Sequence, residues 1–144
     1  THRLNKDDAK MIKENDLAVS GESGMQAIVQ LLSTMDVNDC GAFLELEVTS
    51  EKDAIVAATT WKQRQDEEQV PQLVLMLDNF GPERSKEMVR ELTDMGLRDA
   101  IVLEASGNIV FEDLEAWREC GVDVLSTSAI NRGTAPLDVS MLID

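Results

Sequence analysis

Apolar and polar residues follow one another along the chain in a repeating order: a short apolar run, a few polar residues, then a segment with helical spacing. The apolar runs lie at residues 9–16, 42–48, 72–79, 99–108 and 122–129, and we expect each to form a strand. Helices are predicted between them, at 21–35, 49–68, 81–96 and 110–121. Strands that alternate with helices are typical of a parallel sheet.

Local signals mark where these helices begin and end. Thr49 or Ser50 is a candidate N-cap for the helix at 49–68, since a hydroxyl there can accept a hydrogen bond from a free backbone N–H. Pro82 suits the first turn of the helix at 81–96, and Gly96 suits its end. The elements are therefore placed well enough to ask which kind of sheet they form.

The number of strand–helix units limits the choice of fold. A closed barrel of eight units takes about 250 residues, and this chain has 144. Two architectures remain: a doubly wound sheet of the flavodoxin type, or an incomplete parallel α/β barrel-type sheet of about five strands with alternating helices. Glu45 and Glu47 share one face of their strand. Because two carboxylates are costly beneath helices but suit a barrel interior near its mouth, we favour the barrel-type sheet.

Composition adds constraints on the core and on partners. Aromatic residues make up only 3% of the chain, so we expect an aliphatic core. The net charge of −15 disfavours nucleic acid and anionic membranes as partners. This acidity suits a protein from a high-salt habitat and an ordinary acidic cytosolic protein alike. No apolar run approaches the ~20 residues of a membrane-spanning helix.

The cysteines and the histidine narrow the chemistry further. Cys40 and Cys120 lack the spacing of a metal site, so we expect reduced, buried thiols and a cytoplasmic protein. His2 is the one histidine in the sequence, which excludes a histidine-based metal cluster within one chain.

Polar side chains lie at or near the end of every predicted strand. Since the carboxyl ends of parallel strands form the ligand-binding rim of α/β folds, we expect one shared site there. The alternative is that each polar end is only a loop or a helix cap. The residues concerned are Lys13, Glu14 and Asn15; Glu45 and Glu47; Asp78 and Asn79; Glu104, Ser106 and Gly107; and Ser126 and Ser128.

The residue types at this rim favour a phosphorylated ligand. Glu47 and Asp78 are carboxylates on neighbouring strands, suited to a Mg²⁺ ion that keeps some of its waters. The small-residue turn at Ser106 and Gly107 could hold a phosphate with its backbone N–H groups. The combination fits phosphorylated-sugar chemistry in which Mg²⁺ neutralises a leaving group.

A group of cations near the N-terminus favours an anionic second substrate. Lys13, with His2 and Arg3 nearby in sequence, supplies positive charge in a chain that mostly lacks it. A carboxylate is the simplest ligand for such a group. Ordinary surface charge is the alternative interpretation.

Five ordered motifs resemble one enzyme family. The segments "THRLNKDDAKMIKEN", "LELEVTS", "LMLDNF", "VLEASGNI" and "GVDVLSTSAINRGTAPLDVSM" occur in the order and spacing of quinolinate phosphoribosyltransferase. The resemblance covers nearly the whole chain. It implies an N-terminal α/β domain followed by an incomplete α/β barrel, in a homodimer or higher oligomer. We therefore expect residues 1–144 to be the C-terminal part of the barrel domain, with the N-terminal domain and the first barrel strand absent.

The resemblance also implies a reaction. Members of the family join quinolinate to phosphoribosyl pyrophosphate, assisted by Mg²⁺, and release pyrophosphate and carbon dioxide to give nicotinate mononucleotide, a step of NAD biosynthesis. By motif, His2, Arg3 and Lys13 would hold the carboxylates of quinolinate. Glu47 and Asp78 would face the ribose and Mg²⁺–pyrophosphate, so that Lys13, Glu47 and Asp78 are the catalytic candidates and Glu47 and Asp78 the metal ligands.

The two last motifs imply a phosphate-binding side of the site. Ser106, Gly107 and Asn108 match the turn that the family writes "SGG", and Ser126 and Ser128 match its last phosphate-side loop. All five are candidate substrate-binding residues.

Several positions depart from the family pattern. Asp16 stands where the family usually has a histidine, Asn108 replaces a glycine, and Ser128 replaces another. The family's front region, which carries an "RKT" motif, has no counterpart here. We therefore expect weak or no turnover from this chain alone. The competing interpretation is a non-catalytic isolated domain or remnant that binds phosphoribosyl ligands or another subunit.

Overall fold

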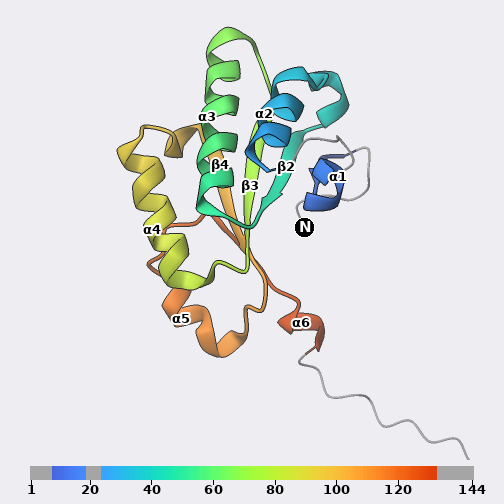
Figure 1. Cartoon of the computed structure of the whole chain (residues 1–144). Coiled ribbons are helices and arrows are strands. Elements are labelled where there is room, and N and C mark those ends of the chain that lie inside the picture. The colour runs from blue at the N-terminus through green and yellow to red at the C-terminus, as the bar shows by residue number, and fades with distance from the viewer. Residues whose placement is uncertain (1–7, 19–23, 133–144) are drawn as a thin grey trace, which may run out of the picture.

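The chain folds as one parallel sheet with helices between its strands (Figure 1). A computed structural model describes residues 8–18 and 24–132. The strands are β1 (Lys10–Ile12), β2 (Phe43–Val48), β3 (Gln72–Asp78), β4 (Ile101–Ser106) and β5 (Val124–Ser126). The helices are α1 (Glu14–Ala18), α2 (Met25–Thr34), α3 (Glu51–Glu67), α4 (Gly81–Asp94), α5 (Leu114–Trp117) and α6 (Ala129–Arg132). Short 3₁₀ turns are η1 (Val37–Cys40), η2 (Arg98–Ala100) and η3 (Phe111–Asp113).

The order of the strands decides between the two predicted architectures. Neighbours in the sheet follow the chain order β1-β2-β3-β4-β5, and every neighbouring pair is parallel. A doubly wound sheet reverses its order at a switch point, and these strands show no such reversal. The flavodoxin-type alternative is therefore wrong, and the predicted five-stranded barrel-type sheet is confirmed as an open row of strands.

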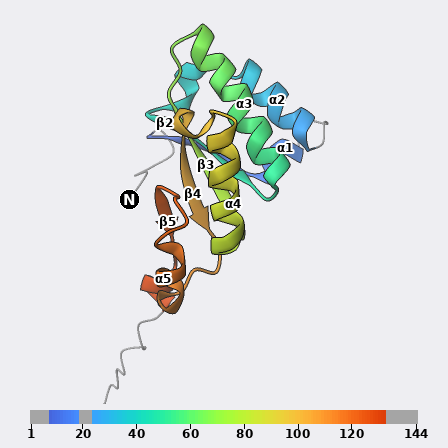
Figure 2. The same ribbon diagram turned by 90° about the vertical axis from the view of Figure 1, so that its left-hand side faces the viewer.

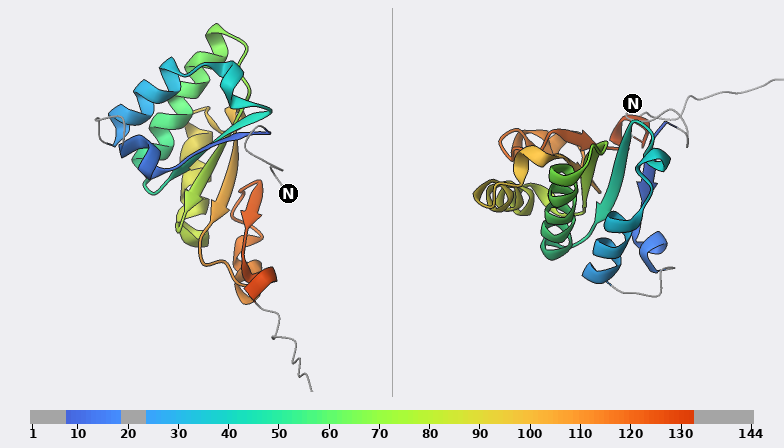
Figure 3. Two further views of the ribbon diagram at one scale, coloured as in Figure 1. Left: turned by 90° about the vertical axis from the view of Figure 1, so that its right-hand side faces the viewer. Right: turned by 90° about the horizontal axis from the view of Figure 1, so that it is seen from above.

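All three long helices lie on one face of this sheet (Figure 3). Alternate strand residues point to that face, and the aliphatic side chains among them are fully buried against the helices. Helix α3 contributes small residues, which let it lie close to the strands, and the large buried ring of Trp61. The helix-facing strand residues at the centre of this core are Leu44, Leu46, Leu73, Leu75, Leu77 and Leu103.

The signals predicted to begin α3 and to begin and end α4 are confirmed. Ser50 is the N-cap of α3, and its hydroxyl oxygen accepts from the Asp53 N–H at 3.2 Å. Pro82 lies in the first turn of α4. Gly96 ends α4 with a φ of 69°, and the next N–H, that of Leu97, donates to the Leu92 carbonyl at 2.8 Å. This pairing is typical of a glycine-terminated helix.

The first predicted strand is too long. It was expected over 9–16, but β1 ends at Ile12 and α1 follows. The cause lies in Asp16, whose carboxylate accepts from the Lys13 N–H at 2.9 Å while its own N–H donates to the Lys13 carbonyl. This reach-back bond caps a helical turn and ends the strand.

The last part of the chain also differs from the prediction. The helix expected over 110–121 is reduced to η3 and the four-residue α5, which lie beyond the carboxyl ends of the strands (Figure 2). Of this segment, only Trp117 and Cys120 are buried, so little packing supports a longer helix. The strand expected over 122–129 is confined to β5, and the short α6 was not predicted.

The predicted burial of both cysteines is confirmed. Cys40 and Cys120 are both buried and unbonded to each other, and burial raises the pKa of the Cys40 thiol. No helix within the described ranges combines the length and apolarity needed to cross a membrane.

Candidate active site

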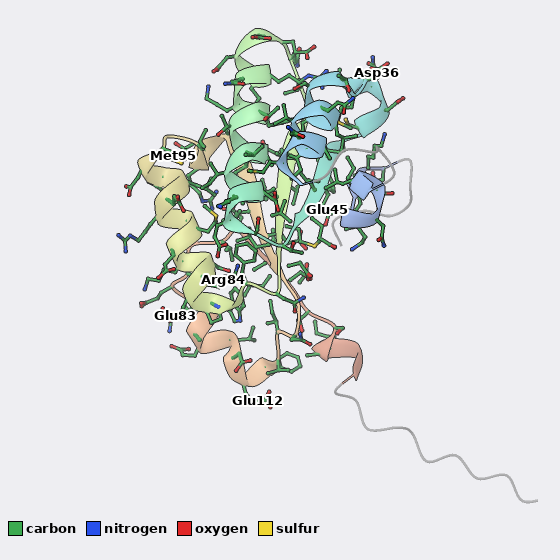
Figure 4. The ribbon with its side chains drawn as sticks, viewed as in Figure 1. Asp36, Glu45, Glu83, Arg84, Met95 and Glu112 are labelled. Carbon is green, nitrogen blue, oxygen red and sulfur yellow. The ribbon has the colours of Figure 1, made fainter. Side chains whose placement is uncertain are left out.

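The face of the sheet opposite the helices carries most of the acidic and hydroxyl side chains of the strands. Strand alternation turns Glu45 and Glu47 away from the helices, because Leu44, Leu46 and Val48 fill the other face. Glu45 is fully buried, and the Glu47 side chain is 14% exposed. The prediction that these two carboxylates share one face of their strand is therefore confirmed (Figure 4 labels Glu45).

Register places the other strand-end residues on this same face. Glu47 pairs with Met76, which pairs with Glu104. One pleat further toward the carboxyl ends, Asp78 pairs with Ser106, and Ser106 pairs with Ser126. Asp78 is thus a diagonal neighbour of Glu47 on the adjacent strand. We call this carboxyl-terminal half of the open face the polar face.

Lys13 brings a cation to the polar face. It follows β1 directly, and its ammonium forms an ion pair with the Glu47 carboxylate of the neighbouring strand. Half of the Lys13 side chain is exposed, whereas Glu47 is mostly enclosed. The Lys13 ammonium is therefore accessible to a ligand, and the ion pair holds the Glu47 carboxylate in place.

A pocket of about 500 Å³ lies beside Asp78 at the end of the sheet. It is formed by the turn after β4 and the loop after β5, so segments twenty residues apart in sequence meet there. All five residues predicted to bind the phosphate side are in its wall: Ser106, Gly107, Asn108, Ser126 and Ser128, together with Asn79, Ile109 and Thr127.

The hydroxyl groups in this pocket are not equally available. Ser126 Oγ donates its one proton to Glu104 Oε1 at 2.5 Å, and Thr127 Oγ1 donates to the Ile109 carbonyl. The hydrogen bonds among the described residues use neither the Ser106 nor the Ser128 hydroxyl. Ser106 and Ser128 are therefore the hydroxyl donors ready for an anion, and Ser126 can donate to one only if it leaves Glu104.

The turn after β4 lies directly against the end of β3. Asn79 and Asn108 hold left-handed conformations with φ of 57° and 53°, and Gly107 has a φ of 96°. A Cβ added to Gly107 would lie 2.3 Å from Asn79 Oδ1, so only glycine fits there. This close approach joins the Asp78 strand end to the pocket wall.

A second cation at the same end of the sheet serves the structure. Arg84, near the start of α4 (labelled in Figure 4), stacks over the Phe80 ring at 4.3 Å and donates to Glu51 Oε1 at 2.8 Å. The pKa of Glu51 is lowered most by a hydrogen bond from the Glu51 backbone N–H and next by the hydrogen bond from Arg84. The pair joins the first turns of α3 and α4 on the helix side of the rim.

Comparison with known proteins identifies the family. The family model described as the C-terminal domain of quinolinate phosphoribosyl transferase matches residues 1–142. The chain belongs to the quinolinate phosphoribosyltransferase family. The resemblance drawn from the five sequence motifs is thereby confirmed.

Individual members of the quinolinate phosphoribosyltransferase family show the extent of the match. The chain is 32% identical to a probable nicotinate-nucleotide pyrophosphorylase (carboxylating) of Methanothermobacter thermautotrophicus, covering 99% of this chain and 46% of that protein. It is 33% identical to a protein of the same name from Archaeoglobus fulgidus, covering 99% and 48%. The structure of the nicotinate-nucleotide pyrophosphorylase from Francisella tularensis superposes with a TM-score of 0.60 at 29% identity, covering 85% of this chain and 37% of that one. The chain thus spans about half the length of the curated relatives it matches.

Most of the predicted site residues of this family member lie together. Lys13, Glu47, Asp78 and Ser106 share the polar face, and the pocket adjoins it. His2 and Arg3 lie outside the described residues. Sequence reasoning gave no role to Asn79 or Glu104, although both had been noted as polar strand ends. For Asn79 the signal was its residue type, because asparagine adopts a left-handed backbone more readily than most residues. The part-buried bond from Ser126 to Glu104 joins two strands and leaves no mark in the local sequence.

The carboxylates on the polar face could supply part of the ligand shell of a Mg²⁺ ion. Within the described part of the chain, no three histidine, cysteine or acidic residues cluster as a metal site. Glu47 and Asp78 provide two carboxylates on adjacent strands. Such a pair suits an ion that takes its other ligands from water and from substrate phosphates, which is the usual mode for Mg²⁺.

Proposed function

We propose that this chain carries the phosphoribosyl pyrophosphate side of a quinolinate phosphoribosyltransferase site. The reaction would join quinolinate to phosphoribosyl pyrophosphate, releasing pyrophosphate and carbon dioxide to give nicotinate mononucleotide. The observation that carries the proposal is the gathering of Lys13, Glu47, Asp78 and Ser106 on one face at one end of the sheet. Family membership and the relatives' names support the choice of reaction.

On this proposal the carboxylates act on developing positive charge. As the bond between the anomeric carbon and pyrophosphate loosens, the ribose ring becomes cationic. Glu47 is mostly enclosed and held by Lys13, so its charge is preorganised where the ring would lie. Asp78 would stand on the pyrophosphate side, beside the pocket. Glu47 and Asp78 would hold Mg²⁺, whose positive charge would neutralise the leaving pyrophosphate.

The remaining polar groups would bind and orient the substrates. The Ser106 and Ser128 hydroxyls, with the backbone N–H groups of the 106–108 turn, would hold a phosphate in the pocket. The exposed Lys13 ammonium would meet a quinolinate carboxylate while it remains beside Glu47. Fixing both substrates against one sheet face would supply the alignment that a two-substrate transfer requires.

Calorimetric titration of phosphoribosyl pyrophosphate with Mg²⁺ tests the proposal. We expect saturable binding that Asp78→Asn weakens about tenfold or more, because the substitution removes a charge next to the metal–pyrophosphate group. Asp36→Asn is the matched control. Asp36 lies in an exposed turn at the end of the molecule opposite Glu112 (Figure 4), and its substitution should leave binding unchanged.

The same titration separates the competing functions. A well-folded chain that shows no saturable binding, or equal binding by Asp78→Asn, would contradict the proposal. Binding without formation of nicotinate mononucleotide from added quinolinate would favour a non-catalytic phosphoribosyl-binding domain. Turnover would establish the transferase directly.

A further inference from the structure

Two asparagines link the turns that follow β3 and β4. Asn79 Nδ2 donates to Asp78 Oδ2 at 2.8 Å, and Asn108 Nδ2 donates to Asn79 Oδ1 at 2.9 Å. Both asparagines have the left-handed backbone that this residue type adopts more readily than most. The result is a chain of hydrogen bonds that runs from Asn108 through Asn79 to Asp78.

The direction of this chain follows from the charge of Asp78. An ionised carboxylate only accepts hydrogen bonds, so Asn79 must present its NH₂ group to Asp78 and its carbonyl oxygen to Asn108. Asn108 must then present its own NH₂ group to Asn79. Asn108 thereby selects the one orientation of the Asn79 amide that supports Asp78.

Packing confines the Asn79 side chain to this position. The Gly107 backbone lies so close that a Cβ there would be 2.3 Å from Asn79 Oδ1 and 2.6 Å from its Cγ. The Asn79 N–H donates to the Ser106 carbonyl at 2.9 Å, which continues the ladder of β3 and β4 past the last strand residues. Asn79 is thus wedged between the pocket turn and Asp78.

We propose that Asn79 is a positioning residue that holds the Asp78 carboxylate in its orientation on the polar face, and that Asn108 orients the Asn79 amide for this purpose. The inference rests on the proposed function, in which Asp78 stands on the Mg²⁺ and pyrophosphate side. It makes the pocket turn and the carboxylate one connected unit rather than two separate ligand-binding groups.

The first test needs no ligand. Glycine accepts a positive φ, so Asn79→Gly and Asn108→Gly remove the side chains without adding backbone strain. Three-bond NMR couplings that report χ1 of Asp78 should show one rotamer in the parent chain and averaged rotamers in Asn79→Gly. Asn108→Gly should give a smaller degree of averaging, since the Asn79 amide remains.

A matched control lies elsewhere in the chain. Asn38 Nδ2 donates to Asp36 Oδ1 at 2.8 Å, which is the same amide–carboxylate contact at a place remote from the pocket. Asn38→Ala should leave the Asp78 couplings as they are in the parent. A single Asp78 rotamer in Asn79→Gly, or averaged rotamers already in the parent, would overturn the proposal.

The second test asks whether Asn79 acts through Asp78. By calorimetry, Asn79→Gly should weaken Mg²⁺-dependent binding of phosphoribosyl pyrophosphate about three- to tenfold. Binding without Mg²⁺ should weaken less than Mg²⁺-dependent binding, whereas general damage to the pocket would weaken both equally. In the Asp78→Asn background, Asn79→Gly should cause no further loss.

The outcomes of the two tests distinguish the proposals. An equal loss with and without Mg²⁺, or a further loss in the Asp78→Asn background, would mean that Asn79 contacts the ligand directly and would overturn the positioning role. A parent chain that binds no phosphoribosyl pyrophosphate would contradict the proposed function. The ligand-free couplings would still decide whether Asn79 and Asn108 position Asp78.

Discussion

The same strands build two unlike surfaces. Toward the helices they present a continuous aliphatic layer, in which Leu46 and Leu75 are fully buried. Toward the other side, the residues between them in sequence include Glu45 and Glu47 of β2, and register brings Asp78 of β3 and Glu104 of β4 to the same surface. One surface is held together by packing, and the other concentrates like charge.

This difference teaches how the sheet divides its tasks. Burial of aliphatic side chains stabilises the fold by about 25 cal/mol for each Å² removed from water. Like charges on one face work against folding and persist where a ligand or cation uses them. Substitutions on the helix-covered face should therefore change stability, and substitutions on the polar face should change binding.

The largest expected effect is a difference in stability between a substitution on the helix-covered face of β3 and one on the polar face of the adjacent β2. Leu75→Ala should lower the free energy of unfolding by about 2–5 kcal/mol, because it leaves a cavity in the centre of the core. Glu47→Gln keeps the shape of the side chain and loses one ion pair with a half-exposed lysine. Such pairs contribute about 0–1 kcal/mol, so its unfolding free energy should stay within about 1 kcal/mol of the parent.

Urea unfolding measures the stability of both variants. The phosphoribosyl pyrophosphate titration measures their affinity, and there we expect Glu47→Gln to show the larger loss. Glu47→Gln should lose affinity about tenfold, as expected for a charged contact. Comparable destabilisation by Leu75→Ala and Glu47→Gln would remove the distinction between the faces.

Gly107 is a place where the polar face does constrain the fold. Gly107→Ala should destabilise the chain by about 2–4 kcal/mol, since its Cβ would overlap Asn79 and its φ of 96° suits only glycine. Gly96→Ala is the matched control: Gly96 has a φ of 69° and open space around the missing Cβ. It should cost only about 1 kcal/mol, and equal thermal shifts for the two variants would disprove the close approach at Gly107.

What the sequence could predict differs between the helix-covered face and the polar face. Hydrophobic runs predict the central strands and the three long helices that form the aliphatic layer. Ser50 and Pro82 mark where α3 and α4 begin. The polar strand ends predicted which residues would share a face, because strand alternation and parallel pairing depend only on position.

Other features of the fold and the site differ from what the hydrophobic pattern predicts. The cap that Asp16 places on Lys13 shortens β1, and α5 is short because its segment buries little besides Trp117 and Cys120. The bond from Ser126 to Glu104 withdraws a hydroxyl that sequence reasoning had assigned to phosphate. Of these three features, the Ser126–Glu104 bond joins two strands that are distant in sequence.

The smallest expected effect concerns an acid that serves the fold rather than the polar face. Asp123 Oδ2 accepts from the Leu103 N–H at 2.7 Å, and Arg98 donates to Oδ1 at 2.8 Å. Burial opposes the charged form, but these hydrogen bonds prevail and lower the pKa of Asp123. Its contribution is therefore complete above the unfolded-state pKa of about 3.9 and is lost as the pH falls through the lower folded-state value.

Asp123→Asn isolates this contribution. Because 42% of the Asp123 side chain is exposed, solvent screening should limit the loss to about 1 kcal/mol at pH 7. The difference in unfolding free energy between parent and variant should shrink as the pH falls below about 4, since both then carry a neutral group. Glu51→Gln is the comparison variant. The pKa of Glu51 is also lowered, but both partners of its ion pair with Arg84 are exposed. A pH-independent difference for Asp123→Asn would show that the shape of the side chain, and not its charge, holds β5 to the sheet.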